Sequence, residues 1–127
     1  MGSRFDLYKT KKVVFFDETA SGAAEVQCDE YASLVFDVFG ATTFAINVYG
    51  SPDGTHFHLL CIIPMTSTVS GPITQITGLG LCGTCVAGLQ TVRLVIASMG
   101  EQETVSVIGR LSTAPFNYPY CCQTVLQ

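Results

Sequence analysis

The chain has 127 residues, of which 48% are hydrophobic and 13% are charged, and its formal net charge is −4. Its six Lys and Arg do not form the basic patch of a nucleic-acid-binding protein, and no apolar run approaches the roughly 18 residues of a membrane-spanning helix. An average domain is about 25% charged, so a single soluble domain with so few charges exposes apolar or neutral surface that we expect other subunits to cover.

Residues 1–12 are predicted to form an N-terminal arm. They contain two aromatic residues, Phe5 and Tyr8, among charged ones. The segment lacks the apolar stretch of a secretory signal, so we expect synthesis in a reducing cytosol, where the six cysteines remain free thiols.

Residues 13–111 alternate between apolar and polar positions, a pattern that predicts short β-strands. An apolar run at Val13–Phe16 precedes a polar, small-residue stretch at Asp17–Ala24, and short strands are predicted at Ile73–Ile76 and Leu79–Ala87. The other predicted strands place one face inward, made of Leu34, Phe36 and Val38; Phe44, Ile46 and Val48; Phe57, Leu59, Cys61 and Ile63; Val92, Leu94 and Ile96; and Val105 and Val107. About eight short strands in one block predict an all-β domain, an antiparallel β-sandwich or jelly roll.

Residues 112–127 are predicted to form an extended C-terminal tail. Phe116, Tyr118 and Tyr120 are spaced by two around a pair of prolines, and proline cannot join a central ladder. The aromatics either anchor a neighbouring subunit or fold back over the chain's own sandwich.

The cysteines offer one motif with known chemistry. Cys82 and Cys85 form a C-x-x-C pair, but a structural zinc site needs four ligands, and the adjacent Cys121–Cys122 is a poor second pair. The pair also lies among glycines on a predicted strand, not at the start of a helix as in redox proteins. Cys28 and Cys61 are expected to be small core residues. Structural thiols are therefore the favoured interpretation.

The remaining polar residues do not assemble into a predicted active site. His56 and His58 follow a turn formed by Gly50–Thr55, and Asp53 lies nearby, but no third metal ligand follows at a suitable spacing. Neither a nucleophile elbow nor a phosphate-binding loop is present. Arg93, in an otherwise apolar strand, is expected to face outward or to form an interface ion pair. We expect no catalytic residue, no cofactor-binding residue, no metal ligand and no enzyme activity.

Turns and strand edges follow a recognisable pattern between residues 44 and 113. Its pieces are Val48-x-Gly50-Ser51-x-Asp53-Gly54-x-x-Phe57-x-x-Leu60, Gly78-x-Gly80 leading into Val86-Ala87-Gly88-Leu89, Thr91-Val92-Arg93-Leu94, and Val105-x-Val107-x-Gly109-Arg110-x-Ser112-Thr113. This pattern resembles the small β-sandwich structural proteins of tailed-bacteriophage virions. The resemblance implies a β-sandwich that decorates or cements a capsid, or a module of a fibre or tail accessory.

We accordingly expect a non-enzymatic virion structural protein, assembled in the host cytoplasm as a capsid decoration or cement protein. Its partners would be the major capsid protein or other virion subunits, and the resemblance implies a homo-oligomer, with a trimer as the expected state. The predicted partner-binding residues are the arm and tail aromatics Phe5, Tyr8, Phe116, Tyr118 and Tyr120. The alternative is a carbohydrate- or receptor-binding module, whose site would lie in loops at one end, around Ser51–His58 and Met99–Glu103.

Overall fold

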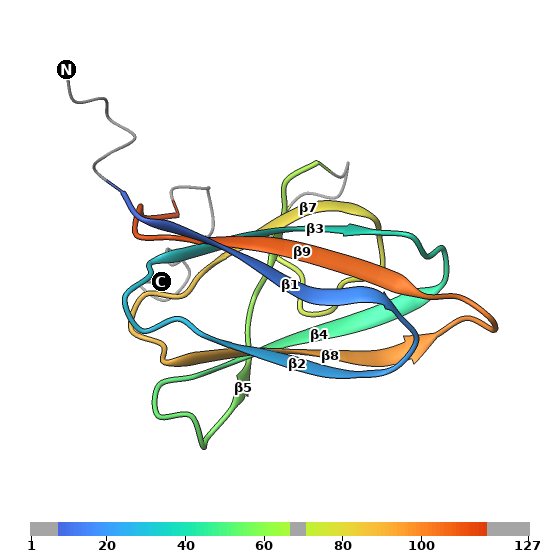
Figure 1. Ribbon diagram of the computed structural model, residues 1–127, viewed down its shortest axis with the longest axis horizontal. Helices are drawn as coiled ribbons and strands as arrows, with labels where there is room; N and C mark the ends of the chain where they lie inside the picture. The colour runs from blue at the N-terminus through green and yellow to red at the C-terminus, as the bar shows by residue number, and fades with distance from the viewer. Residues whose placement is uncertain (1–7, 67–70, 117–127) are drawn as a thin grey trace.

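The computed structural model describes residues 8–66 and 71–116, which fold into two antiparallel sheets packed face to face (Figure 1). One sheet has five strands in the order β1-β9-β3-β7-β6, and the other has four in the order β2-β8-β4-β5. The strands are β1 (Thr10–Thr19), β2 (Gly22–Gln27), β3 (Ser33–Phe39), β4 (Phe44–Ser51), β5 (His58–Leu59), β6 (Ile63–Pro64), β7 (Gly80–Cys85), β8 (Thr91–Met99) and β9 (Val105–Ser112). The predicted all-β antiparallel sandwich is confirmed. In the part of the chain described, no helix is long and apolar enough to cross a membrane.

The core lies between the two sheets and follows the alternation of the sequence. On β3, Leu34, Phe36 and Val38 are buried, whereas Asp37 between them is exposed. Ile46 on β4 lies in the same buried cluster. Each buried side chain of this size contributes about 1.5–3 kcal/mol relative to an exposed one, which is why the period-two pattern determines the inward faces.

The first strand, β1, extends further at both ends than the predicted apolar run Val13–Phe16. β1 begins at Thr10, inside the predicted arm, and continues into the polar stretch as far as Thr19. It is an edge strand of the five-stranded sheet, where polar side chains can face solvent while the backbone pairs with β9. Register shifts between Val14 and Thr19 bend it, and they leave both Phe15 and Phe16 buried.

The segment after the Gly50–Thr55 turn departs from the predicted strand. His58–Leu59 pairs with β4 in one sheet, but Ile63–Pro64 pairs with β7 in the other. Because the chain crosses between sheets here, the alternation does not hold. Leu59 and Cys61 are exposed, so the prediction that they belong to the core is wrong, whereas Cys28 is buried as expected. The predicted strand Ile73–Ile76 forms only two isolated bridges.

Candidate protein-docking surface

The outer face of the five-stranded sheet carries a row of apolar side chains. Antiparallel register places Val14 beside Ile108 on β9 and Leu81 beside Asp37 on β3. Residues directly opposite each other in register share a face of the sheet. Val14 is 54% exposed and Leu81 is 38% exposed. We call this surface the apolar face; it comprises Val14, Val35, Phe39, Leu81 and Ile108.

Two shallow depressions cross this face and meet at Ile108. One, of about 360 Å³, is lined among others by Lys12, Val35, Asp37 and Arg110. The other, of about 440 Å³, is lined among others by Val14, Phe39, Ser106 and Thr104. Both are open to solvent and mainly apolar, which suits contact with another protein surface better than enclosure of a small molecule.

The charged groups on the apolar face have few partners within the chain. Arg110 donates a hydrogen bond to Thr10 Oγ1 at 3.1 Å. The Asp37 carboxylate has no hydrogen-bond or ion-pair partner among residues 8–66 and 71–116. These two opposite charges are therefore available to a partner at little cost to the fold.

One edge of the same sheet is covered by the first residues of the predicted tail. Ser33 Oγ donates to the carbonyl of Ala114 at 2.8 Å, which holds the segment against β3. A Cβ placed on Gly83 would lie 2.5 Å from ring carbons of Phe116, so the aromatic ring fits only over a glycine. Ile63, directly opposite Gly83 in register, is 2% exposed. Up to Phe116, then, the tail folds back over its own sandwich, one of the two alternatives predicted.

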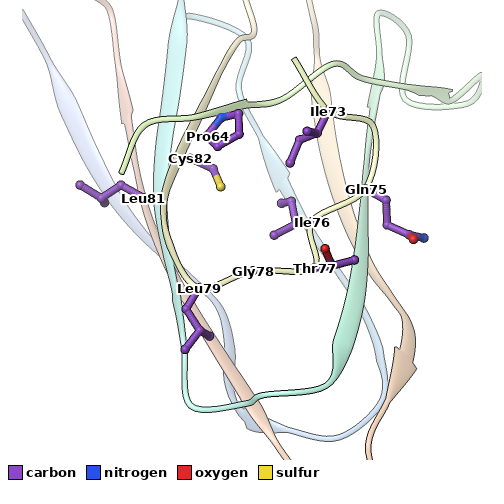
Figure 2. Close-up of a pocket in the computed structure, with 9 residues that line it drawn as sticks. All are labelled: Pro64, Ile73, Gln75, Ile76, Thr77, Gly78, Leu79, Leu81 and Cys82. Carbon is purple, nitrogen blue, oxygen red and sulfur yellow. The ribbon is translucent and has the colours of Figure 1, made fainter. Parts of the chain in front are cut away.

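A small pocket lies at the open edge between the two sheets, next to the apolar face (Figure 2). Ile73, Ile76 and the Cys82 sulfur point into it, whereas Leu81 points away toward the outer surface (Figure 2). Its volume is about 130 Å³, which fits one apolar side chain. Leu79, 52% exposed, also lines this pocket, so the apolar surface continues from the sheet face to the sheet edge.

The cysteine pair does not converge on one point. Cys82 is buried on the inner side of β7, and Cys85, three residues on, points to the other face, as the period of a strand requires. Burial, with a smaller effect from Asp37, raises the pKa of the Cys82 thiol to about 11. Burial raises the pKa of Cys28 to about 11 as well. The described residues contain no group of three or more His, Cys, Asp or Glu placed to hold a metal ion.

The outer face of the four-stranded sheet, in contrast, is closed by contacts within the chain. Arg93 faces outward, as expected, and its Nε donates to Glu25 at 2.6 Å, while its guanidinium lies 3.9 Å from the centroid of the Phe57 ring. Gln75 donates to Asn47 Oδ1 at 2.9 Å beside them. The ion pair of Arg93 is thus made inside the chain.

The two loops proposed for a glycan site lie at opposite ends of the sandwich, so that prediction is wrong (Figure 1). β4 and β8 are antiparallel, with Phe44 opposite Met99 and Ser51 opposite Thr91, so the loop that follows β4 and the loop that follows β8 leave from opposite ends. No single site can include both.

The carboxylates in those loops are used by the fold itself. Asp53 accepts hydrogen bonds from the backbone N–H groups of His56 and Thr55, and these bonds place its pKa well below the ordinary value. His56 Nδ1 lies 2.7 Å from the same carboxylate. Glu103 accepts hydrogen bonds from the backbone of Thr43 and from Thr42, which lowers its pKa too.

The predicted partner-binding aromatics are only partly within the structure. Tyr8 is 47% exposed, and Phe116 packs over Gly83. Phe5, Tyr118 and Tyr120 lie outside the described residues. Sequence reasoning missed the apolar face, although its signal was present: runs such as Val13–Phe16 are apolar at successive positions and therefore supply both faces of a strand.

No protein-family model and no curated protein sequence matches the chain. Among solved structures, the chain is similar to the SPBc2 prophage-derived protein YomS, with a TM-score of 0.73 and 16% identity, over 83% of this chain and 94% of YomS. It is also similar to the PBSX exported protein XepA, with a TM-score of 0.74 and 20% identity, over 83% of this chain and 38% of XepA. The chain therefore shares its fold with a prophage-derived protein. This confirms the predicted resemblance for the architecture alone.

Proposed function

We propose that this chain is a non-enzymatic structural protein of a phage particle, a capsid decoration or cement protein that acts as a homo-oligomer. Its partners are the major capsid protein or other virion subunits, and its site of action is the virion, after assembly in the host cytoplasm. The observation that carries the proposal is the apolar face, which residues 8–66 and 71–116 leave uncovered, on a sandwich whose other outer face is closed by contacts within the chain.

The energetics of that face favour an assembly role. Burying apolar surface contributes about 25 cal/mol per Å², and a specific interface buries about 800 Å² on each partner. Val14, Leu81 and Phe39 each expose more than a third of their surface on a rigid sheet. A sheet already fixed by its ladders loses little conformational entropy when a second surface covers it, so binding retains most of this gain.

The similarity in fold to YomS supports a phage origin for the architecture. The polar groups support a role without catalysis. Asp53 and Glu103 hold turns, Arg93 closes the outer face of the four-stranded sheet, and Cys82 is a buried neutral thiol. Each of these groups is accounted for by folding.

The proposal is tested on purified particles of the phage that encodes the chain. Mass spectrometry should find the protein in the particles, and particles from a gene deletion should lose their DNA at lower temperature. An Ile108→Asp variant, charged in the middle of the apolar face, should no longer join the particle. Ala23→Asp is the matched control, because Ala23 is exposed on the outer face of the other sheet. Absence of the protein from particles would overturn the proposal.

A further inference from the structure

We infer that the apolar face is self-complementary and binds the same face of a second copy around a two-fold axis. The inference deepens the proposed function, on which it rests for the existence of a homo-oligomer, by naming the surface and the symmetry of the contact. It replaces the three-fold association expected from the sequence with a two-fold pair.

The register of the five-stranded sheet places charged and apolar side chains next to one another on its outer face. In one row across the strands, Arg110 on β9 stands beside Val35 on β3. In the next row on the same face, Ile108 on β9 stands beside Asp37 on β3. The four residues therefore form a small quadrilateral, with the two charges on one diagonal and the two apolar side chains on the other.

A two-fold axis along the apolar diagonal makes this pattern match itself. Rotation about that line brings Arg110 over Asp37 of the second copy and Asp37 over its Arg110, as an isologous contact requires. Ile108 and Val35 lie on the axis and meet their own counterparts. The result is an apolar centre with an opposite-charge pair on each side. Such an axis crosses the strands of the two copies at a steep angle, in the manner of near-orthogonal sheet packing.

The charges favour a second copy over a different protein surface. A partner patch of one sign would attract one end of the charged diagonal and repel the other, whereas a copy of this face pairs both ends. Among the described residues, the Asp37 carboxylate has no hydrogen-bond or ion-pair partner, and the Arg110 side chain binds only Thr10 Oγ1. Both groups can therefore form the new pairs without breaking an ion pair within the chain.

The surroundings leave this contact open. Phe116 covers Gly83, which lies on the strand beyond Val35, and so borders the quadrilateral without lying on its axis. Lys12 stands beside Arg110 on the edge strand and adds positive charge to the same end of the diagonal.

Charge reversal tests the inference in the full-length chain. Sedimentation equilibrium should find a dimer for the unsubstituted protein at about 100 µM. Arg110→Asp and Asp37→Arg should each raise the dissociation constant at least tenfold, because each reversal creates two like-charge contacts per dimer. The double variant should return to within about threefold of the original value, since it restores both pairs in exchanged order. Glu101→Lys, a reversal in an exposed turn outside the face, is the control and should change nothing.

Several results would overturn the inference. A monomer or a trimer of the unsubstituted chain at that concentration would do so. So would a dimer that Ile108→Asp leaves unchanged, or single reversals without rescue by the double variant. Thermal unfolding is measured for every variant to check that it is folded. Particles separate the two proposals: an unsubstituted chain that is monomeric in solution but present in particles would overturn the two-fold contact and leave the proposed function standing.

Discussion

The outer faces of the two sheets are built on similar ladders and have opposite characters. On the four-stranded sheet, Arg93 binds Glu25 and stacks over Phe57, and Asn47 binds Gln75. On the five-stranded sheet, the corresponding outward positions hold the apolar face, and Asp37 has no partner among the described residues. A polar face of this kind stabilises the monomer, whereas an uncovered apolar face is stabilised only by what comes to cover it. This difference is the reason why we propose the apolar face as the surface at which the chain meets other molecules.

The largest expected effect is on the free energy of unfolding, and it should differ between the covered edge of the five-stranded sheet and its open middle. Ile63→Ala should lower the free energy of unfolding by about 2–5 kcal/mol, because Ile63 is buried near Phe116 and leaves a cavity. Ile108→Ala, on the apolar face, should lower it by less than about 1 kcal/mol when measured on dilute protein. Urea unfolding followed by circular dichroism measures both. Equal losses would contradict the distinction.

The next effect is the loss of unfolding free energy when each of two outward arginines, one on each sheet, is replaced. Arg93→Ala removes an ion pair and a cation–π contact, both partly exposed, and should cost about 1–2 kcal/mol of unfolding free energy. Arg110→Ala removes one hydrogen bond at the surface and should change stability by no more than about 0.5 kcal/mol. The same unfolding measurement applies. A larger loss for Arg110→Ala would mean that the apolar face supports the fold itself.

The third prediction concerns the end of the sandwich where Glu103 links the loop before β9 to the loop before β4. Hydrogen bonds from the backbone of Thr43 and from Thr42 lower the pKa of Glu103 below its ordinary value of 4.5. The unfolded chain binds this proton more readily, so the stabilisation is complete above that pH and is lost as the pH falls below it. Between about pH 5 and pH 3, a Glu103→Gln variant should lose less stability than the unsubstituted protein. An identical pH profile would contradict the prediction.

The smallest expected effect is on the rate of alkylation, which should differ between thiols inside and outside the sandwich. Cys61 is exposed, whereas burial raises the pKa of Cys28 and Cys82 to about 11. The thiolate is the reactive form, so among the four cysteines of the described residues Cys61 should be alkylated first at neutral pH and the two buried cysteines last. Peptide mapping by mass spectrometry assigns each site along a time course. Early labelling of Cys82 would show that the edge pocket opens readily to solvent.

Much of the fold could be predicted from local patterns. The alternation of Leu34, Phe36 and Val38 gave their inward face, because a strand turns successive side chains to opposite sides. The turn at Asp53 and Gly54 was predicted from residue type, and Gly54 adopts a φ of 80°. The extent of β1 was missed, because an edge strand is held by backbone pairing and tolerates polar side chains such as those of Thr10 and Glu18.

Less of the candidate site could be predicted. The sequence pointed to aromatic residues at the two ends, whereas the described surface that stands open is on the strands, at positions such as Val14 and Ile108. Cys61 and Leu59 were placed in the core because nothing local marks the point where the chain leaves one sheet for the other. The charged diagonal of Arg110 and Asp37 depends on the pairing of β9 with β3, which are separated by most of the chain.

By itself, the sequence determined that the chain forms strands, where most of them turn, and that only 13% of its residues are charged. These properties depend on neighbouring residues and on composition. Only the tertiary structure decided which outward side chains find partners and which do not, because strand order and register bring together residues from distant parts of the chain. Arg93 meets Glu25 across one sheet and Asp37 remains unpaired in the described part of the other, for that reason alone.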